Sequence, residues 1–361
     1  MNRETTAHLR SVDDLTRVSG PLQEPSRKFV GIWQFDKPIE RAWAEELLGP
    51  HIERHVFDGD RKVVLPNAIL FDKHITRHSR EYYQKFKGTN SILLHYLDET
   101  YEGGYERYCA FAGVIRWHWS SLFDDPSILV IPIGYREGPP SLNIRPLAAR
   151  RYVWSFAGQV YKSSRPDMAA ALSSIEPHFL IRTDKREDGS MLDRFVEADE
   201  YYDVMTDSMF APCPMGNVNI ECFRLYEALE CGAVPIVEKR LYFDYYRKLL
   251  GDHPIPTISR WSDATHLIRD CLRNPEKLLG LQGECMAWWK SYKARLQHSV
   301  SDFLARTGSR PAPRDVTSKL LGHRTWQYLE LLKHHDARAL RRRVQRQVRR
   351  VLRDRKWRDR R

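Results

Sequence analysis

The residues best suited to chemistry lie in one segment, APCPMGNVNIECFRLYEALECGAVPIVE, from Ala211 to Glu238. Its pattern predicts a strand, a loop, a helix that stops at Gly232, and a second strand. A helix that begins at the carboxyl end of a parallel strand directs its N–H groups and positive dipole end into the crevice beside the sheet. The segment therefore predicts a phosphate site, and Gly216 would let the backbone approach a ligand closely.

Two charged residues of this helix strengthen that prediction. Arg224 lies in the first turns, where its guanidinium can donate charge-assisted hydrogen bonds to a diphosphate. Glu227 follows one turn later, where a carboxylate can accept hydrogen bonds from vicinal ribose hydroxyls. The alternative is an ordinary i,i+3 ion pair on a solvated helix face.

The run ECFRLYEALECGAVPIV resembles the nucleotide-binding signature of exostosin-like glycosyltransferases, R-x-x-E-A-L-x-x-G-x-V-P-V. Upstream, FAGQVYKSSRPDMAAAL resembles that family's strand, glycine and basic-helix element, which implies that Gly158, Lys162 and Arg165 lie near the donor phosphates; their alternative is a solvated turn. The positions that match the signature are Arg224, Glu227, Ala228, Leu229, Gly232, Val234 and Pro235. The candidate nucleotide-sugar-binding residues are Gly158, Lys162, Arg165, Gly216, Asn219, Glu221, Arg224 and Glu227.

This resemblance implies two Rossmann-like domains that face a central cleft, the GT-B type of glycosyltransferase. The donor would bind the second domain and the acceptor the first, with inversion at the anomeric carbon. Arginines, a lysine and a helix N-terminus can stabilise a leaving phosphate, so no metal or other cofactor is expected. In agreement, no DxD lies beside a strand end of the donor half, and the histidine pairs do not reach zinc-ligand spacing.

An inverting transfer needs a general base near the acceptor hydroxyl. His95, Asp98 and Glu99 are the candidates, because all three lie at the carboxyl end of one predicted strand of the first half, SILLHYLDE. Asp98 is the first choice and Glu99 is close behind. Each also has a structural alternative, as a core histidine or as a carboxylate that caps the next helix.

The elements that must position these residues alternate between strand and helix. In the first half we expect strands over residues 28–35, 62–72, 91–99 and 127–135, with helices over 41–52 and 105–119. In the second half we expect strands over 151–161, 178–184, 208–214 and 233–239, with helices over 164–175, 221–232 and 261–297. This alternation predicts an α/β fold of two doubly wound parallel sheets.

A Pro/Gly-rich linker after residue 135 marks the boundary between the halves. The domains expected are a lead-in over 1–27, an acceptor domain over 28–147, a nucleotide-sugar domain over 148–310, and C-terminal helices with a basic amphipathic tail over 311–361. The 361 residues suffice for two cores, and the 42% hydrophobic content excludes a largely disordered chain.

Composition also bears on location. No stretch of about 18 apolar residues and no secretory signal are evident, so we expect a soluble chain without a transmembrane stem. The six cysteines lack CxxC spacing and lie mostly in apolar segments, which indicates reduced core thiols and a cytoplasmic location.

The net charge of +11 resides in the tail. Residues Arg338 to Arg361 contain 13 Lys/Arg and 2 Asp, while the rest of the chain has 45 basic and 45 acidic residues. Apolar residues at helical spacing and Trp357 predict a basic helix that lies on an anionic membrane surface. The alternatives are a helix packed against the enzyme, or nonspecific attraction to nucleic acid; no specific nucleic acid is expected.

The function expected is therefore an inverting, metal-independent glycosyltransferase, with a UDP-sugar favoured as donor. Its acceptor would be a hydroxyl of a glycan or of a lipid-linked or surface polymer. Two alternatives stay open: a fucosyltransferase-like enzyme that uses a GDP-sugar on the same scaffold, and a non-catalytic adaptor that binds polyanions.

Overall fold

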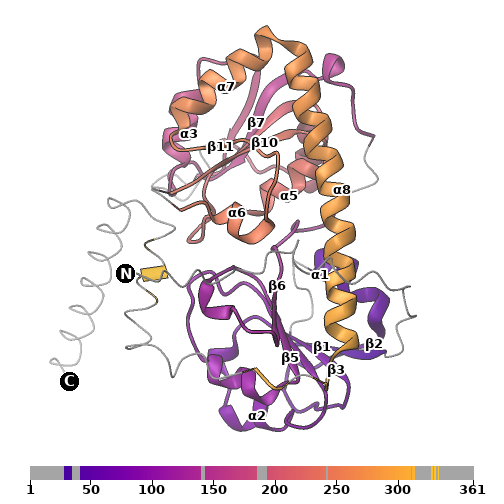
Figure 1. The fold of residues 1–361 in the computed structure, drawn as a ribbon. Helices are drawn as coiled ribbons and strands as arrows, with labels where there is room; N and C mark the ends of the chain where they lie inside the picture. The colour runs from indigo at the N-terminus through magenta and orange to yellow at the C-terminus, as the bar shows by residue number, and fades with distance from the viewer. Residues whose placement is uncertain are drawn as a thin grey trace, which may run out of the picture.

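The structure, a computed structural model, describes residues 28–34, 41–139, 143–184, 193–240, 243–309 and 311–313, together with residues 327, 329, 330 and 332. These residues form two lobes, each built on one parallel sheet, and a long helix runs along one side of both (Figure 1).

The first sheet has six strands in the order β2-β1-β3-β4-β5-β6, and every neighbouring pair is parallel. Helices α1 (Arg41–Leu48) and α2 (Arg80–Gln84) belong to this lobe. The strands are β1 (Phe29–Trp33), β2 (Ile52–Phe57), β3 (Ala68–Asp72), β4 (Ile92–His95), β5 (Gly113–Arg116) and β6 (Ile128–Val130).

The second sheet has five strands in the order β11-β10-β9-β7-β8, again all parallel. The strands are β7 (Tyr152–Gly158), β8 (His178–Arg182), β9 (Ser208–Cys213), β10 (Val234–Glu238) and β11 (Thr257–Ile258). The helices are α3 (Arg165–Leu172), α4 (Ala198–Thr206), α5 (Phe223–Glu230), α6 (Tyr245–Leu250), α7 (Trp261–Arg273) and α8 (Pro275–Ala305).

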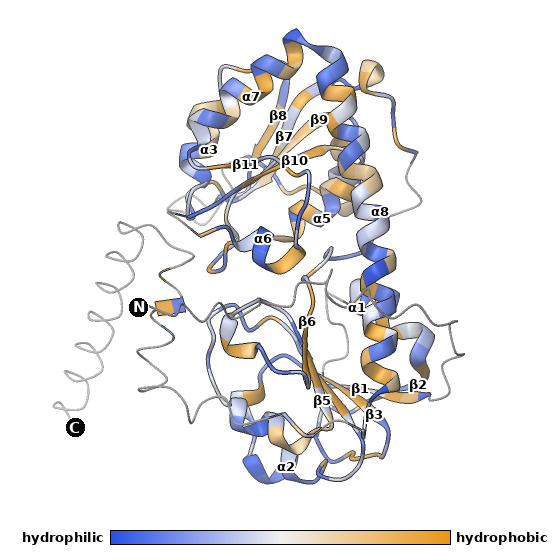
Figure 2. Cartoon of the chain, in the orientation of Figure 1, coloured by the Kyte–Doolittle hydropathy of each residue, from blue (hydrophilic) through white to orange (hydrophobic). Residues whose placement is uncertain are grey.

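Both sheets are doubly wound. In each, the chain moves from its first strand to one side and then returns to build the other side, so the direction reverses between β1 and β3 and between β7 and β9. Central strands such as β3 and β10 are buried along their whole length, as parallel strands covered on both faces must be. Figure 2 shows these apolar strands inside and hydrophilic residues on the outer helices. The predicted fold class is confirmed.

Some local expectations differ from the structure. Residues 105–119, expected as one helix, form a 3-10 segment (Tyr105–Ala110) and then strand β5. The residues of β5 are buried on both faces, and such a continuous apolar run has no period that separates a strand from a helix. Strands β2 and β11 and helices α2, α4 and α6 were not expected. The predicted C-terminal basic helix lies outside the described residues.

Helix α8 joins the two lobes. Near its start, Gln282 donates to the carbonyl of Gly232 at 2.6 Å, whereas near its end Ser301 lies 3.1 Å from His51 of the first lobe. Between these contacts, Lys293 pairs with Glu230 of α5 at 2.6 Å and with Glu46 of α1 at 3.4 Å. One apolar core consequently runs through both lobes along this helix.

The linker after β6 is fastened to the first lobe. Trp43 of α1 donates to the carbonyl of Pro132 at 2.9 Å. Gly134 has a φ of +64°, and a Cβ there would lie 2.2 Å from the Trp43 ring, so only glycine fits. The start of the linker, at Pro132 and Gly134, is therefore held against α1.

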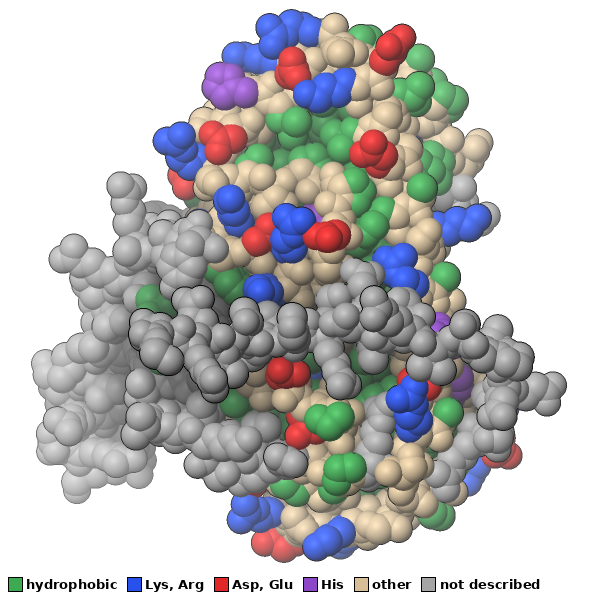
Figure 3. Space-filling model, viewed as in Figure 1, with side chains coloured by type: hydrophobic (Ala, Val, Ile, Leu, Met, Phe, Trp, Pro, Cys, Tyr) green, Lys and Arg blue, Asp and Glu red, His purple; other side chains and the backbone are tan. Residues whose placement is uncertain are grey.

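On the face in Figure 3, basic and acidic side chains are interspersed over both lobes. All six cysteines are thiols, and five of them are buried. Among the described residues, no helix combines the length and apolarity needed to cross a bilayer.

Candidate functional site

The switch point of the second sheet, between β7 and β9, opens into a cavity of about 450 Å³. Loops that follow parallel strands on either side of a switch point diverge, which leaves a crevice at the carboxyl edge. The volume lies in the range of sites for small molecules. The second lobe supplies most of the wall, and the first lobe with its linker adds Glu99, Ile133, Arg136 and Glu137.

Two arginines meet in this cavity. Arg224 lies over the Phe156 ring at 4.1 Å and donates to the carbonyl of Ala157 at 2.7 Å. Arg165 donates to the carbonyl of Gln159 at 3.0 Å. Burial, together with the charge of Arg224, lowers the pKa of Arg165 to about 10. Two cations held close together and partly out of water favour an anionic ligand between them.

The N-terminus of α5 faces the same space. Cys222 is the N-cap residue, its thiol makes no capping hydrogen bond, and Cys222, Phe223 and Arg224 all line the cavity. The helix dipole therefore adds positive potential beside the two arginines. Gly216 also lines the cavity, and a Cβ there would lie 2.5 Å from the backbone oxygen of Glu221, so the loop closes tightly only with glycine.

Two carboxylates that the sequence did not single out shape the loops around this site. Asp184 accepts the N–H groups of Val160 and Tyr161 at 3.0 and 3.2 Å, which fixes the loop after β7. Glu238, at the end of β10, accepts the N–H of Met215 at 2.7 Å and the hydroxyl of Ser164. The position of Glu238 at a strand end was the available signal.

Glu227 lines the cavity as expected. Its carboxylate accepts the Tyr201 hydroxyl at 2.7 Å and the N–H of Arg136 in the linker at 3.4 Å. Burial raises its pKa. The long bond to Arg136 is the weaker of the two, so a ribose hydroxyl can replace it at little cost.

The remaining predicted donor residues occupy different positions. Gly158 lines the cavity, whereas Lys162 is half-buried outside the lining, near Arg165 and Glu99. Glu221 lines it too, but its oxygens accept Tyr226, Tyr245 and the N–H of Ile133 at 2.6, 2.8 and 2.9 Å. Asn219 is fully buried and contacts the first lobe. Glu221 and Asn219 therefore hold protein groups in this structure.

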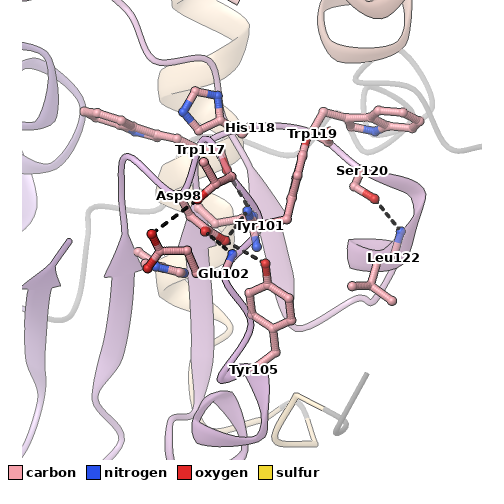
Figure 4. A network of polar contacts seen from close by, with 12 residues as sticks. Asp98, Tyr101, Glu102, Tyr105, Trp117, His118, Trp119, Ser120 and Leu122 are labelled. Carbon is pink, nitrogen blue, oxygen red and sulfur yellow. Dashed lines mark hydrogen bonds and ion pairs between the residues drawn. The ribbon is translucent and has the colours of Figure 1, made fainter. Parts of the chain in front are cut away.

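The three candidate bases differ in their position relative to the cavity. Glu99 lines the cavity and is half-buried. Asp98 is buried away from it and accepts the Tyr105 hydroxyl at 2.7 Å, the N–H of Glu102 at 2.9 Å and the Arg116 guanidinium at 3.3 Å (Figure 4). This set of donors leaves Asp98 little capacity to accept a proton from a substrate.

His95 is also outside the cavity lining. His95 is the last residue of β4, and its Nδ1 lies 2.6 Å from the Tyr108 hydroxyl. Burial lowers the pKa of His95 to about 4, so its imidazole is neutral near pH 7. Its environment is that of a core histidine.

The cavity has an apolar side that the sequence did not indicate. Phe195 lines it and is 60% exposed. Val196 and Tyr201, the hydrogen-bond partner of Glu227, line it as well. An exposed ring at the mouth of a polar cavity can stack on a planar group. No group of three or more metal-ligating side chains occurs among the residues that the structure describes.

Comparisons with known proteins find similarity chiefly in the second half of the chain. The family model described as the RXYLT1 C-terminal domain matches residues 140–307, which contain the second sheet, α8 and most of the cavity wall. The model that matches is thus not that of the exostosin-like family, although the signature residues fall inside the matched segment.

Two curated relatives share a name, ribitol-5-phosphate xylosyltransferase 1. The mouse protein is 24% identical over 174 residues, which cover 43% of this chain and 38% of the relative. The human protein is 33% identical over 90 residues, 25% of this chain and 20% of the relative. The matched segments thus span less than half of these relatives. Among solved structures, an α1,3-fucosyltransferase aligns with a TM-score of 0.45 and 11% identity, over 77% of this chain and 93% of that one.

Proposed function

We propose that this chain is a glycosyltransferase that binds a nucleotide-sugar in the cavity between β7 and β9 and transfers the sugar to a hydroxyl group. The observation that carries the proposal is the convergence of Arg165, Arg224 and the N-terminus of α5 on one cavity that both lobes line. Similarity of the second half to a xylosyltransferase domain supports the same reaction class.

The wall of the cavity suggests how a donor lies. The diphosphate would occupy the space between Arg165 and Arg224, next to Gly216. The ribose would lie at Glu227, and the nucleobase would face Phe195. The sugar would then point toward Glu99 of the first lobe. A UDP-sugar is the favoured donor on the resemblance of the helix signature.

In the transfer we assign the base to Glu99. Its carboxylate would take the proton of the acceptor hydroxyl while the oxygen attacks the anomeric carbon from the face opposite the phosphate, which inverts the configuration. The bond to the phosphate oxygen breaks, and the nucleoside diphosphate leaves with its charge stabilised by the two arginines and α5. This chemistry needs no metal. The acceptor would be a glycan or surface-polymer hydroxyl.

Nucleotide binding tests the donor site directly. A thermal-shift and calorimetric panel of UDP, GDP and CMP, each with and without EDTA, should show one preferred nucleotide whose affinity is independent of EDTA. A ligand at 100 times its Kd stabilises the folded state by about 2.7 kcal/mol. If GDP is preferred, the donor class is that of fucosyltransferase-like enzymes. If no nucleotide binds, the proposal fails and a polyanion-binding adaptor becomes the better hypothesis.

The role of Glu99 is tested by Glu99→Gln. This change should lower transfer by about 10²- to 10⁴-fold and leave UDP affinity unchanged, because a general base acts only in the chemical step. Glu102→Gln is the matched control, since Glu102 lies on the same loop and is exposed outside the cavity lining. Turnover within a few fold of wild type in Glu99→Gln would place the base elsewhere.

A further inference from the structure

A chain of hydrogen bonds connects the donor loop to the loop that carries Glu99. It starts at Asn219, between β9 and α5, whose side-chain amide donates to the Tyr101 hydroxyl at 3.3 Å. The Tyr101 hydroxyl in turn donates to the carbonyl of Trp119 at 2.8 Å. Tyr101 is fully buried and lies two residues after Glu99.

The chain then returns to the donor loop. The N–H of Trp119 donates to the Tyr245 hydroxyl at 2.9 Å, and that hydroxyl donates to Glu221 at 2.8 Å. Asn219 and Glu221 are themselves joined, because the Asn219 side-chain oxygen accepts the N–H of Glu221 at 3.1 Å. The hydrogen bonds thus form a closed circuit that leaves the donor loop, passes through the first lobe at Tyr101 and Trp119, and comes back.

Further hydrogen bonds hold the first-lobe part of this circuit. Tyr101 has a φ of +51°, and its N–H donates to the carbonyl of Asp98 at 3.3 Å. Asp98 accepts the Tyr105 hydroxyl (Figure 4). It also pairs with Arg116, the last residue of β5, and Trp119 follows three residues later. Asp98, which precedes Glu99, and Tyr101, two residues after Glu99, are therefore both held by groups that do not line the cavity.

We propose that Tyr101 and Asn219 are positioning residues that hold Glu99 in register with the donor sugar. This proposal rests on the function proposed above. A buried hydrogen bond between the lobes fixes the distance between the loop of Glu99 and the donor loop, which neither lobe fixes alone. A misplacement of about 1 Å can cost about 10²-fold in rate. Neither residue needs to touch the substrate to act in this way.

The test separates alignment from donor binding. Tyr101→Phe removes the hydroxyl. Asn219→Asp keeps the acceptor for the N–H of Glu221 but removes the N–H donor, so the Tyr101 hydroxyl can no longer accept from residue 219 while it donates to Trp119. Each variant should lower kcat by about 10- to 100-fold, measured as transfer or as donor hydrolysis with water as acceptor. The Kd for UDP, measured without acceptor, should stay within about three-fold of wild type.

The double variant and a control complete the design. Tyr101→Phe combined with Asn219→Asp should lose less than the product of the two single effects, because both act through one bond. Tyr83→Phe is the control: Tyr83 is equally buried in the first lobe and also loses a hydroxyl bond, here to Asp72 at 2.6 Å. It should keep kcat near that of wild type.

Three outcomes would overturn the proposal: unchanged kcat in both single variants, a rise in the Kd for UDP that matches the loss of rate, or an equal loss of rate in Tyr83→Phe. Failure of the proposed function has a different signature. It would appear as no nucleotide binding to the wild type, or as unchanged UDP affinity in Arg224→Ala, and both are read without any transfer.

Discussion

Replacement of Arg224 is the sharpest single test of the donor site. Arg224→Ala removes the guanidinium that lies over Phe156 and donates to Ala157, and it leaves Arg165 as the neighbouring cation. A hydrogen bond to a charged group contributes about 1.5–3 kcal/mol. Since about 1.4 kcal/mol corresponds to ten-fold in Kd, the Kd for UDP should rise roughly 10- to 150-fold.

The assay is calorimetric titration with UDP. Arg224→Lys should show an intermediate loss, because an ammonium keeps the charge but cannot make two parallel hydrogen bonds with a phosphate. Arg150→Ala is the matched control: Arg150 is a buried arginine of the same lobe that bonds the carbonyls of Ser208 and Cys231 outside the cavity. An unchanged Kd in a folded Arg224→Ala protein would refute the assignment of the diphosphate to this site.

The structure gives three further predictions, and the sequence of the tail gives a fourth. Glu227→Gln should weaken UDP about ten-fold and leave the affinity for 2′,3′-dideoxy-UDP unchanged; equal losses for both nucleotides would exclude ribose recognition. Phe195→Ala should weaken UDP, since stacking on a base is worth about 1–3 kcal/mol, but should spare pyrophosphate binding. The pKa of His95 is about 4 in the folded state and about 6.5 in the unfolded state. As the pH falls from 6.5 to 4, His95 therefore gains a proton mainly in the unfolded chain. Stability should therefore drop over that window by about 3 kcal/mol, and urea unfolding of His95→Gln should lack this component. Deletion of residues 337–361, outside the described part of the chain, should abolish sedimentation with anionic liposomes; undiminished binding would reject a membrane role for the tail.

The grouping of the second-half residues around one cavity was predictable because their signals are local. A strand, a glycine loop and a helix N-terminus are adjacent in sequence, so Gly216, Arg224 and Glu227 could be placed in one crevice from the pattern alone. All three line the cavity. Gly158 and Arg165 came from the resemblance of the preceding strand and helix, and they line it as well.

What the sequence could not give was the partner of each buried polar group. From the sequence, Glu221 was predicted to bind the ligand. In the structure its carboxylate accepts the N–H of Ile133, which is 88 residues away in sequence. Asp98 and Glu99 are neighbours with the same charge, yet one is buried among tyrosines and the other lines the cavity. Only tertiary contacts decide such a choice, as they also decided that the apolar run at β5 is a strand.

Helix α8 constrains where the two lobes of this protein could be recombined with those of a relative. Its first turns contact the second lobe, where Gln282 donates to Gly232. Its last turns contact the first lobe, where Ser301 lies beside His51. A chimera that takes its donor half from a relative must therefore join the two parents twice, once in the linker and once inside α8. Lys293, which pairs with a carboxylate of each lobe, marks the natural position of that second junction.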